Sequence, residues 1–185
     1  MFSDYLADFL EYMEVERGRS LKTIENYSLY LNRFYEFAGD IKVSAIDLNM
    51  VSKWRQWLNR YKGEDGREIS KTTQNYHLIA LRSFLKYMAR RDVKTLAPEK
   101  IELATRKRPQ VTFLTPEEVV ALLTTADTST PTGLRDRAIM ELLFSTGLRV
   151  SELVNLNRDS INLDKGEFSI RGKGQKDRPV YMSDS

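Results

Sequence analysis

The chain has 185 residues, of which 41% are hydrophobic, with 29 Lys and Arg against 26 Asp and Glu, one His and no Cys. This length allows one domain or two small ones, and the lack of Cys excludes disulfides, thiolate zinc sites and a cysteine nucleophile. No apolar run reaches the ~18 residues of a membrane helix and the N-terminus does not resemble a signal peptide, so we expect a cytoplasmic chain with no membrane partner.

Charge is distributed unevenly along the chain. Residues 1–16 contain five acids and no base, residues 17–112 contain 20 bases and 10 acids, and residues 113–185 contain nine bases and 11 acids. A concentrated block of Lys and Arg is typical of proteins that bind nucleic acid. A set of solvated helix faces has the same composition, so charge alone leaves both interpretations open.

The N-terminal part of the chain predicts a helical bundle. Apolar residues recur at helical spacing, serines stand at N-cap positions and glycines close two of the segments. These signals predict four helices: one from Phe2 that ends before Gly18, a second between Ser20 and Gly39, a third over 49–61 and a fourth from Ser70 to Arg90. The charged segment 62–67 is expected to be a loop.

A basic, proline-containing segment at 106–110 has no apolar face and is typical of a domain boundary. We therefore expect a helical domain over 1–104, a linker over 105–112 and a second domain over 113–185. The second domain opens with the signals of a helix start, an N-cap, a proline, a capping box and a hydrophobic staple, supplied by Thr115, Pro116, Glu118, Leu114 and Val119.

The rest of the second domain predicts a buried helix followed by a small sheet. Residues 134–144 are apolar nearly all round, which predicts a helix buried in this domain that ends at Gly147. From Ile161 onward the apolar period becomes alternating. This change predicts three short strands joined by turns at 164–166 and 172–177.

Two basic motifs of the second domain are candidates for phosphate chemistry. In Thr-Gly-Leu-Arg-Val-Ser-Glu-Leu (146–153), Arg149 follows a tight turn, where its planar fork suits bidentate recognition of phosphate, and Glu152 lies three residues on and can orient it. In the glycine-rich hairpin 171–178, Lys173 can reach a phosphate or a leaving oxygen as a charge donor or general acid. An ordinary surface ion pair and a solvated basic turn remain the alternatives.

The order of these motifs resembles the tyrosine recombinase (phage integrase) family, most closely its Xer-type members. The resemblance includes the 146–153 motif, the 171–178 hairpin within a three-stranded sheet, and segments 20–27, 70–76 and 81–84 of the first domain. It implies a mainly α fold: an N-terminal helical-bundle core-binding (SAM-like) domain, followed by a truncated α+β catalytic domain with a small three-stranded antiparallel sheet.

The resemblance also implies roles for residues. Arg149 would grip the scissile phosphate, Lys173 would protonate the departing 5′ oxygen, and Glu152 would support them. The family uses a tyrosine nucleophile that forms a 3′-phosphotyrosyl bond, without metal or other cofactor. The implied partners are double-stranded DNA and other recombinase protomers, which form a tetramer on two DNA sites when full length.

The sequence departs from the family pattern after Lys173. No His-x-x-Arg motif follows, and Tyr181, the sole later tyrosine, falls on a predicted strand, so we assign no nucleophile in this chain. We expect a recombinase fragment that binds DNA without cleaving it, from a protein that resolves chromosome dimers or integrates mobile DNA. The alternatives are a non-catalytic DNA-binding or regulatory protein whose native chain ends near residue 185, and a helical protein-interaction module.

Family analogy places the second and fourth helices across the DNA major groove and backbone. Helix starts and basic or amide side chains there predict DNA contacts from Arg19, Ser20, Lys22, Thr23, Lys71, Thr72, Asn75, His77, Arg82 and Lys86. The linker and hairpin bases add Arg106, Lys107, Arg108, Lys176 and Arg178. An ordinary surface or packing role for His77 stays open at this point.

Overall fold

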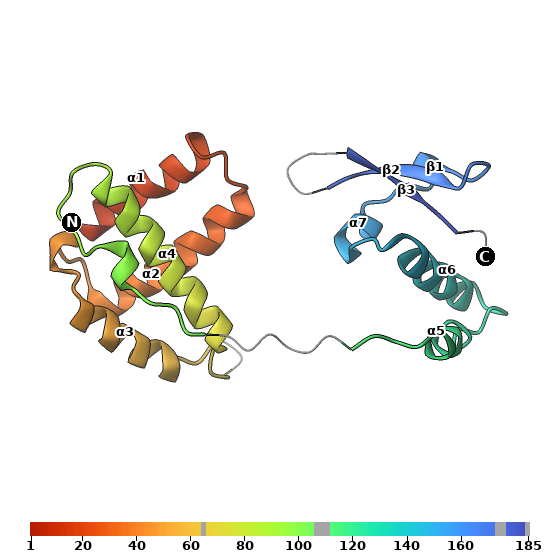
Figure 1. Cartoon of the computed structure of the whole chain (residues 1–185), viewed down its shortest axis with the longest axis horizontal. Coiled ribbons are helices and arrows are strands. Elements are labelled where there is room, and N and C mark those ends of the chain that lie inside the picture. The colour runs from red at the N-terminus through yellow and green to blue at the C-terminus, as the bar shows by residue number, and fades with distance from the viewer. Residues whose placement is uncertain (64–65, 106–111, 173–176, 184–185) are drawn as a thin grey trace. The chain divides into compact units, whose positions relative to one another are not determined.

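The structure, a computed structural model, describes residues 1–63, 66–105, 112–172 and 177–183. It divides into two compact units, Met1–Pro109 and Gln110–Ser185, each of which is described by itself (Figure 1). Lys173, Lys176 and the three linker bases at 106–108 lie outside the described residues. Most of the expected linker lies there too, so the boundaries proposed from the sequence stay a prediction.

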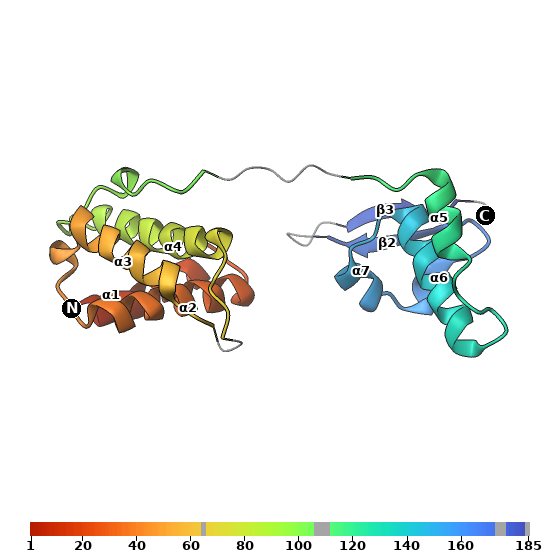
Figure 2. The same ribbon diagram turned by 90° about the horizontal axis from the view of Figure 1, so that it is seen from below.

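The first unit is a bundle of four α-helices, as predicted: α1 (Phe2–Val15), α2 (Leu21–Ala38), α3 (Leu48–Arg60) and α4 (Lys71–Ala89). The described part of this unit also contains two short 3-10 helices, η1 (Val43–Ala45) and η2 (Pro98–Lys100). The predicted N-caps are confirmed, because the hydroxyls of Ser20 and Ser70 accept hydrogen bonds from the backbone N–H groups of Thr23 (3.4 Å) and Thr73 (3.1 Å). Helix α2 packs against both α1 and α4 (Figures 1 and 2).

Aromatic side chains fill the centre of this bundle. The ring of Phe2 lies 4.9 Å from that of Phe84, and Phe34 meets Trp54 edge-on at 4.8 Å between centroids. All four side chains are fully buried, and tilted or edge-to-face rings add to the free energy gained by burial alone. The apolar stripe predicted for the fourth helix is buried as well, at Leu78, Leu81, Leu85 and Met88.

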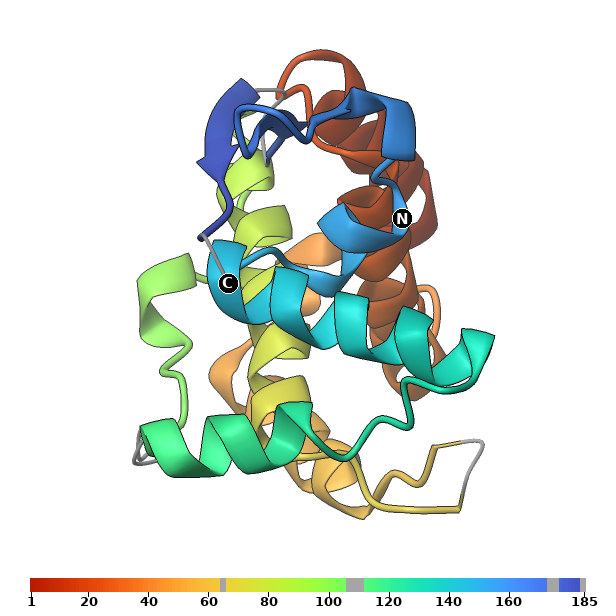
Figure 3. The ribbon, with the colours of Figure 1, turned by 90° about the vertical axis from the view of Figure 1, so that its right-hand side faces the viewer.

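The described residues of the second unit form three α-helices, a short 3-10 helix and a sheet. Their bounds are α5 (Pro116–Leu123), α6 (Pro131–Thr146), α7 (Val150–Val154), η3 (Arg158–Ser160), β1 (Ile161–Asn162), β2 (Glu167–Arg171) and β3 (Asp177–Tyr181). The strands form an antiparallel sheet in the order β1-β2-β3, with Phe168 opposite Val180. Helices α5 and α6 contact each other (Figure 3). In the described parts of the chain no helix is long and apolar enough to cross a membrane.

The capping box at the start of α5 is confirmed. The Thr115 backbone N–H donates to a Glu118 carboxylate oxygen at 2.7 Å, and the Glu118 backbone N–H donates to the Thr115 hydroxyl at 3.3 Å. The residue expected to staple this helix start, Leu114, is 60% exposed. The cap therefore forms by local hydrogen bonding, with most of the apolar surface of Leu114 left in solvent.

The prediction that α6 is buried was wrong for this structure. Its side chains at Leu134, Ile139 and Phe144 are 55%, 37% and 66% exposed. Leu142 and Leu143 pack against a small core. This core consists of Leu148, which precedes α7, and of Phe168, Ile170 and Val180 on one face of the sheet. A helix that is apolar all round needs cover on every side, and the contacts of α6 with α5 and β3 leave Leu134, Ile139 and Phe144 exposed.

We predict that Phe84→Ala destabilises the first unit by about 3–5 kcal/mol, because it removes a fully buried ring and leaves a cavity. Both tryptophans, Trp54 and Trp57, lie in the first unit, so denaturant unfolding followed by tryptophan fluorescence reports on that unit. The matched control is Phe144→Ala on the exposed face of α6, which should leave this transition unchanged. Equal midpoints for Phe84→Ala and the unsubstituted chain would contradict the packing described above.

Candidate nucleic-acid interface and catalytic residues

The backbone on both sides of Arg149 is fixed by local structure. Helix α6 ends at Gly147, which has a φ of 62° and whose N–H donates to the Leu143 carbonyl at 3.0 Å. A left-handed residue at this position favours glycine. Leu148 then enters the small core, 7% exposed, and Arg149 is the N-cap of α7. The Arg149 side chain therefore projects from backbone that these contacts fix, and it is 68% exposed.

Glu152 binds Arg149 in two ways. One carboxylate oxygen, Oε2, accepts the Arg149 backbone N–H at 2.8 Å, and the other, Oε1, accepts the guanidinium Nη1–H at 2.8 Å. The first of these hydrogen bonds and the nearby guanidinium charges hold the pKa of the Glu152 carboxyl below its usual value. The contact that the sequence predicted between these two residues is present, and their roles in chemistry stay predictions.

A second guanidinium reaches the same carboxylate. Arg178 Nη2 donates to Glu152 Oε2 at 3.2 Å. Arg178 lies opposite Ile170 in the antiparallel pair and two residues before Val180, so strand alternation places it on the face of the sheet that carries the small core. Counting back by two from Val180 was a signal for this orientation that the sequence analysis did not use.

In the first unit, α2 and α4 run antiparallel, which separates the predicted DNA contacts into two groups. Tyr27 and Ser83 hydroxyls lie 3.4 Å apart, and Arg33 Nη1 lies 3.2 Å from His77 Nε2. This register brings the start of α2 level with the C-terminal half of α4 and leaves the start of α4 at the other end. The first group is therefore Arg19, Ser20, Lys22, Thr23, Arg82 and Lys86, and the second is Lys71 and Thr72.

Several of these side chains have partners within the unit. Lys22 pairs with Glu25 at 2.9 Å, and the Lys71 ammonium donates to Asn59. Arg82 and Lys86 line a recess of about 230 Å³ beside η2. The Lys86 side chain is exposed and Arg82 is half-buried, so both remain suitable for contact with a phosphate backbone.

Asn75 and His77, predicted to contact DNA, are instead buried. Asn75 is 6% exposed, and its amide exchanges two hydrogen bonds, 2.9 Å and 3.0 Å, with the backbone of Ala104. His77 is 0% exposed; its Nδ1–H donates to the Thr73 carbonyl at 2.7 Å, which leaves Nε2 to accept from Arg33. Polar side chains with all their partners inside the fold are not available to bases, so both assignments are corrected.

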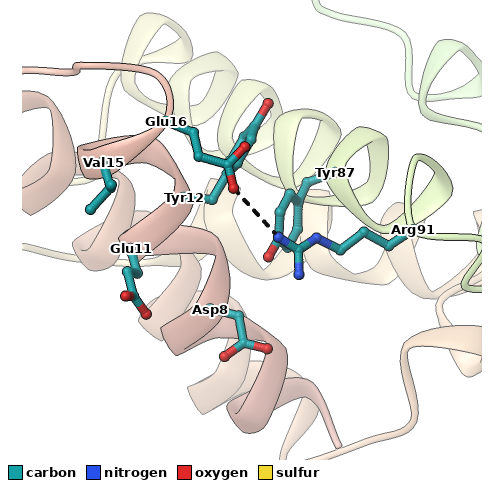
Figure 4. Close-up of a pocket in the computed structure, with 7 residues that line it drawn as sticks. All are labelled: Asp8, Glu11, Tyr12, Val15, Glu16, Tyr87 and Arg91. Carbon is teal, nitrogen blue, oxygen red and sulfur yellow. Dashed lines mark ion pairs between the residues drawn. The ribbon is translucent and has the colours of Figure 1, made fainter.

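A recess between α1 and α4 has the opposite character (Figure 4). Its volume is about 330 Å³ and its lining contains the carboxylates of Asp8, Glu11 and Glu16. The Arg91 guanidinium lies 4.5 Å from the centre of the Tyr87 ring and 3.8 Å from the nearest Glu16 oxygen. With three carboxylates and one guanidinium in its lining, this recess repels phosphate.

Comparison with known proteins assigns the two units to parts of one family. The phage integrase family profile matches residues 112–185, and the phage integrase N-terminal SAM-like domain profile matches residues 6–92. The tyrosine recombinase XerD of Listeria monocytogenes is 36% identical over 186 residues, covering 97% of this chain and 60% of that protein. XerD of Staphylococcus epidermidis is 32% identical with the same coverage. The chain thus spans about 60% of the length of these relatives.

Solved structures agree on the fold. A Tn1549 transposon integrase in complex with circular intermediate DNA matches with a TM-score of 0.72 at 15% identity, over 97% of this chain and 61% of that one. A lambda integrase tetramer bound to a Holliday junction matches with a TM-score of 0.70 at 18% identity, over 97% of this chain and 50% of that one.

We predict that His77 makes the first unit sensitive to acid. Burial lowers the pKa of His77 from 6.5 to about 4, so between these values the unfolded chain binds a proton that the folded chain does not. The contribution of His77 to the free energy of unfolding is therefore constant above pH ~6.5. It falls by about 3 kcal/mol as the pH drops to ~4. The measurement is the free energy of unfolding against pH, by tryptophan fluorescence.

The control for this prediction is His77→Gln, which keeps a donor and an acceptor but does not titrate. Carboxylates contribute equally to both proteins, so the difference between their pH slopes isolates His77. Parallel slopes from pH 6.5 to 4 would contradict a neutral, buried imidazole.

Both units match successive parts of the same family, in the order in which its members carry them, and the similarity to XerD proteins extends over nearly the whole chain. This chain therefore belongs to the phage integrase family of tyrosine recombinases, and it corresponds to the N-terminal portion of Xer-type members.

Proposed function

We propose that this chain is the DNA-binding portion of a site-specific recombinase that cuts and rejoins duplex DNA. The observation that carries the proposal is the position of Arg149: its exposed side chain follows a tight turn and is oriented by hydrogen bonds to the nearly buried Glu152 carboxylate. An exposed guanidinium held in one orientation is suited to a phosphodiester. The first unit would hold the duplex through the Lys and Arg side chains near the ends of α2 and α4.

In the proposed reaction, a tyrosine hydroxyl gives up its proton and its oxygen bonds to the phosphorus of one strand, the bond from phosphorus to the 5′ oxygen breaks, and the 5′ oxygen takes up a proton. Arg149 stabilises the charge that builds on the phosphate oxygens in the transition state. Lys173 is the proposed donor of the proton to the 5′ oxygen. We assign the nucleophile to the part of longer relatives that this chain does not span, so the chain as printed is expected to bind DNA without cleaving it.

We further propose double-stranded DNA and other protomers of the recombinase as partners, in a tetramer on two DNA sites, and a cytoplasmic location. Lambda integrase, which shares the fold, is a tetramer on a Holliday junction in its solved structure. The chemistry needs no cofactor, because the bond energy of the cleaved strand is kept in the phosphotyrosyl intermediate.

We predict that the chain binds short duplex DNA with strong salt dependence. Several phosphate contacts release condensed counterions, so the affinity should fall by about 10³-fold or more between 50 and 200 mM salt. Fluorescence anisotropy of a labelled duplex measures this, with a labelled acidic peptide as the control ligand. Absence of salt-dependent duplex binding would contradict the proposal and favour the protein-interaction module.

We predict that Arg149→Ala, introduced into a polypeptide extended to include the family's tyrosine, retains DNA binding but forms almost no covalent complex. Removal of one oxyanion-stabilising group typically slows such a step by about 10²–10³-fold. A nicked duplex that traps the phosphotyrosyl bond reports the covalent product on a denaturing gel, and Arg137→Ala on α6 is the matched control. Undiminished cleavage by Arg149→Ala would show that this residue does not have the proposed role. If the unsubstituted extended polypeptide binds DNA without cleaving it, the alternative of a non-catalytic DNA-binding protein is favoured.

A further inference from the structure

We propose that Arg178 is a second phosphate-binding guanidinium in the site of Arg149, and that Glu152 holds the two side chains at a fixed spacing. This inference rests on the proposed function, because its ligand is a DNA phosphate. It goes beyond a general DNA contact from the hairpin, since it assigns Arg178 to the same site as Arg149 and gives Glu152 a second partner.

The first step is the position of Arg178. Its neighbours on the same face of the sheet, Ile170 and Val180, are 6% and 5% exposed. A cation at such a position needs a partner or a route to solvent. Arg178 has both: Nη2 donates to Glu152 at 3.2 Å, and the side chain remains 45% exposed.

The second step is the geometry around the carboxylate. The Glu152 side chain is 8% exposed, whereas those of Arg149 and Arg178 are 68% and 45% exposed. Both guanidiniums therefore lie on the solvent side of one shared carboxylate. Among the described residues, each makes side-chain hydrogen bonds only to Glu152, through a single nitrogen. A guanidinium has five N–H donors, so most of the donors on this pair remain open to a ligand.

The third step is charge. One carboxylate between two guanidiniums leaves a surplus of one positive charge on a fixed frame. The other Arg pairs among the described residues of the second unit are one-to-one and neutral: Arg171 with Asp177 at 3.2 Å, Arg137 with Glu141 at 2.6 Å and Arg135 with Asp136 at 2.6 Å. Glu152 caps the start of α7 through the hydrogen bond that it accepts from the Arg149 backbone N–H alone, so the cap does not explain the two guanidiniums. A phosphodiester oxyanion matches both the charge and the two forks.

The test compares duplex affinity against salt for the unsubstituted chain and for Arg178→Ala, Arg149→Ala and Arg137→Ala. Loss of one phosphate contact should lower the magnitude of the slope of log K against log salt by about 0.9 and weaken binding about tenfold near 0.1 M salt. We expect this for Arg178→Ala and for Arg149→Ala, and no change for Arg137→Ala. Arg178→Lys should keep the slope, because the charge is retained.

The outcomes separate this inference from the proposed function. If the unsubstituted chain shows no salt-dependent duplex binding, the proposed function fails. If it binds and Arg178→Ala keeps the slope and affinity of Arg137→Ala, the function stands and this inference is overturned. An affinity loss without a change of slope also overturns it, because Arg178 would then act only by positioning Arg149 through Glu152. Amide hydrogen exchange over α7 in each variant checks that the cap has not melted.

Discussion

A nearly buried carboxylate is tolerated only where donors surround it, and this constraint organises the second unit. Glu152 accepts a backbone N–H and one N–H from each of two guanidiniums. The contacts join α7 to β3, two elements that are distant in sequence and that each contribute one cation. Removing the carboxylate would leave Arg149 and Arg178 to repel each other. The orientation of Arg149 and Arg178, the candidate phosphate-binding residues, thus depends on Glu152, whose negative charge by itself would repel DNA.

In the first unit, hydrogen bonds in the interior fix the helices that carry the basic side chains. Its buried polar groups act inside the fold: His77 links α2 to α4 through Arg33, and Asn75 fixes the backbone at Ala104. Satisfied polar networks of this kind specify one arrangement of helices. The basic side chains therefore stand at the ends of a pair of helices whose register is set by interior contacts.

Local signals made much of this fold predictable. Ser20, Ser70 and Thr115 cap their helices through hydrogen bonds to residues three positions on, so the sequence window contains both partners. Burial depends on what packs from elsewhere. The apolar pattern of α6 implied cover on every side, but the described part of the unit leaves Phe144 66% exposed. The same limit explains Asn75, whose partner at Ala104 lies 29 residues along the chain.

The candidate site was predictable in part for the same reason. Arg149 and Glu152 lie three residues apart, so helical spacing alone brings them together. Arg178 is 26 residues from Glu152, and their contact requires the sheet register to be known. Lys173 falls outside the described residues, so its proposed role rests on the family resemblance.

The distribution of charge within the first unit limits how it can approach DNA. Arg82 lies on α4, and Arg91 lies two residues beyond Ala89, the last residue of that helix. Arg91 faces the acidic recess of α1, whereas Arg82 lines the recess beside η2 with Lys86. A phosphate backbone is repelled from the first side and attracted to the second. The three carboxylates of the acidic recess thus make the charge of the first unit asymmetric, and the side of α4 that carries Arg82 and Lys86 is the one suited to a duplex.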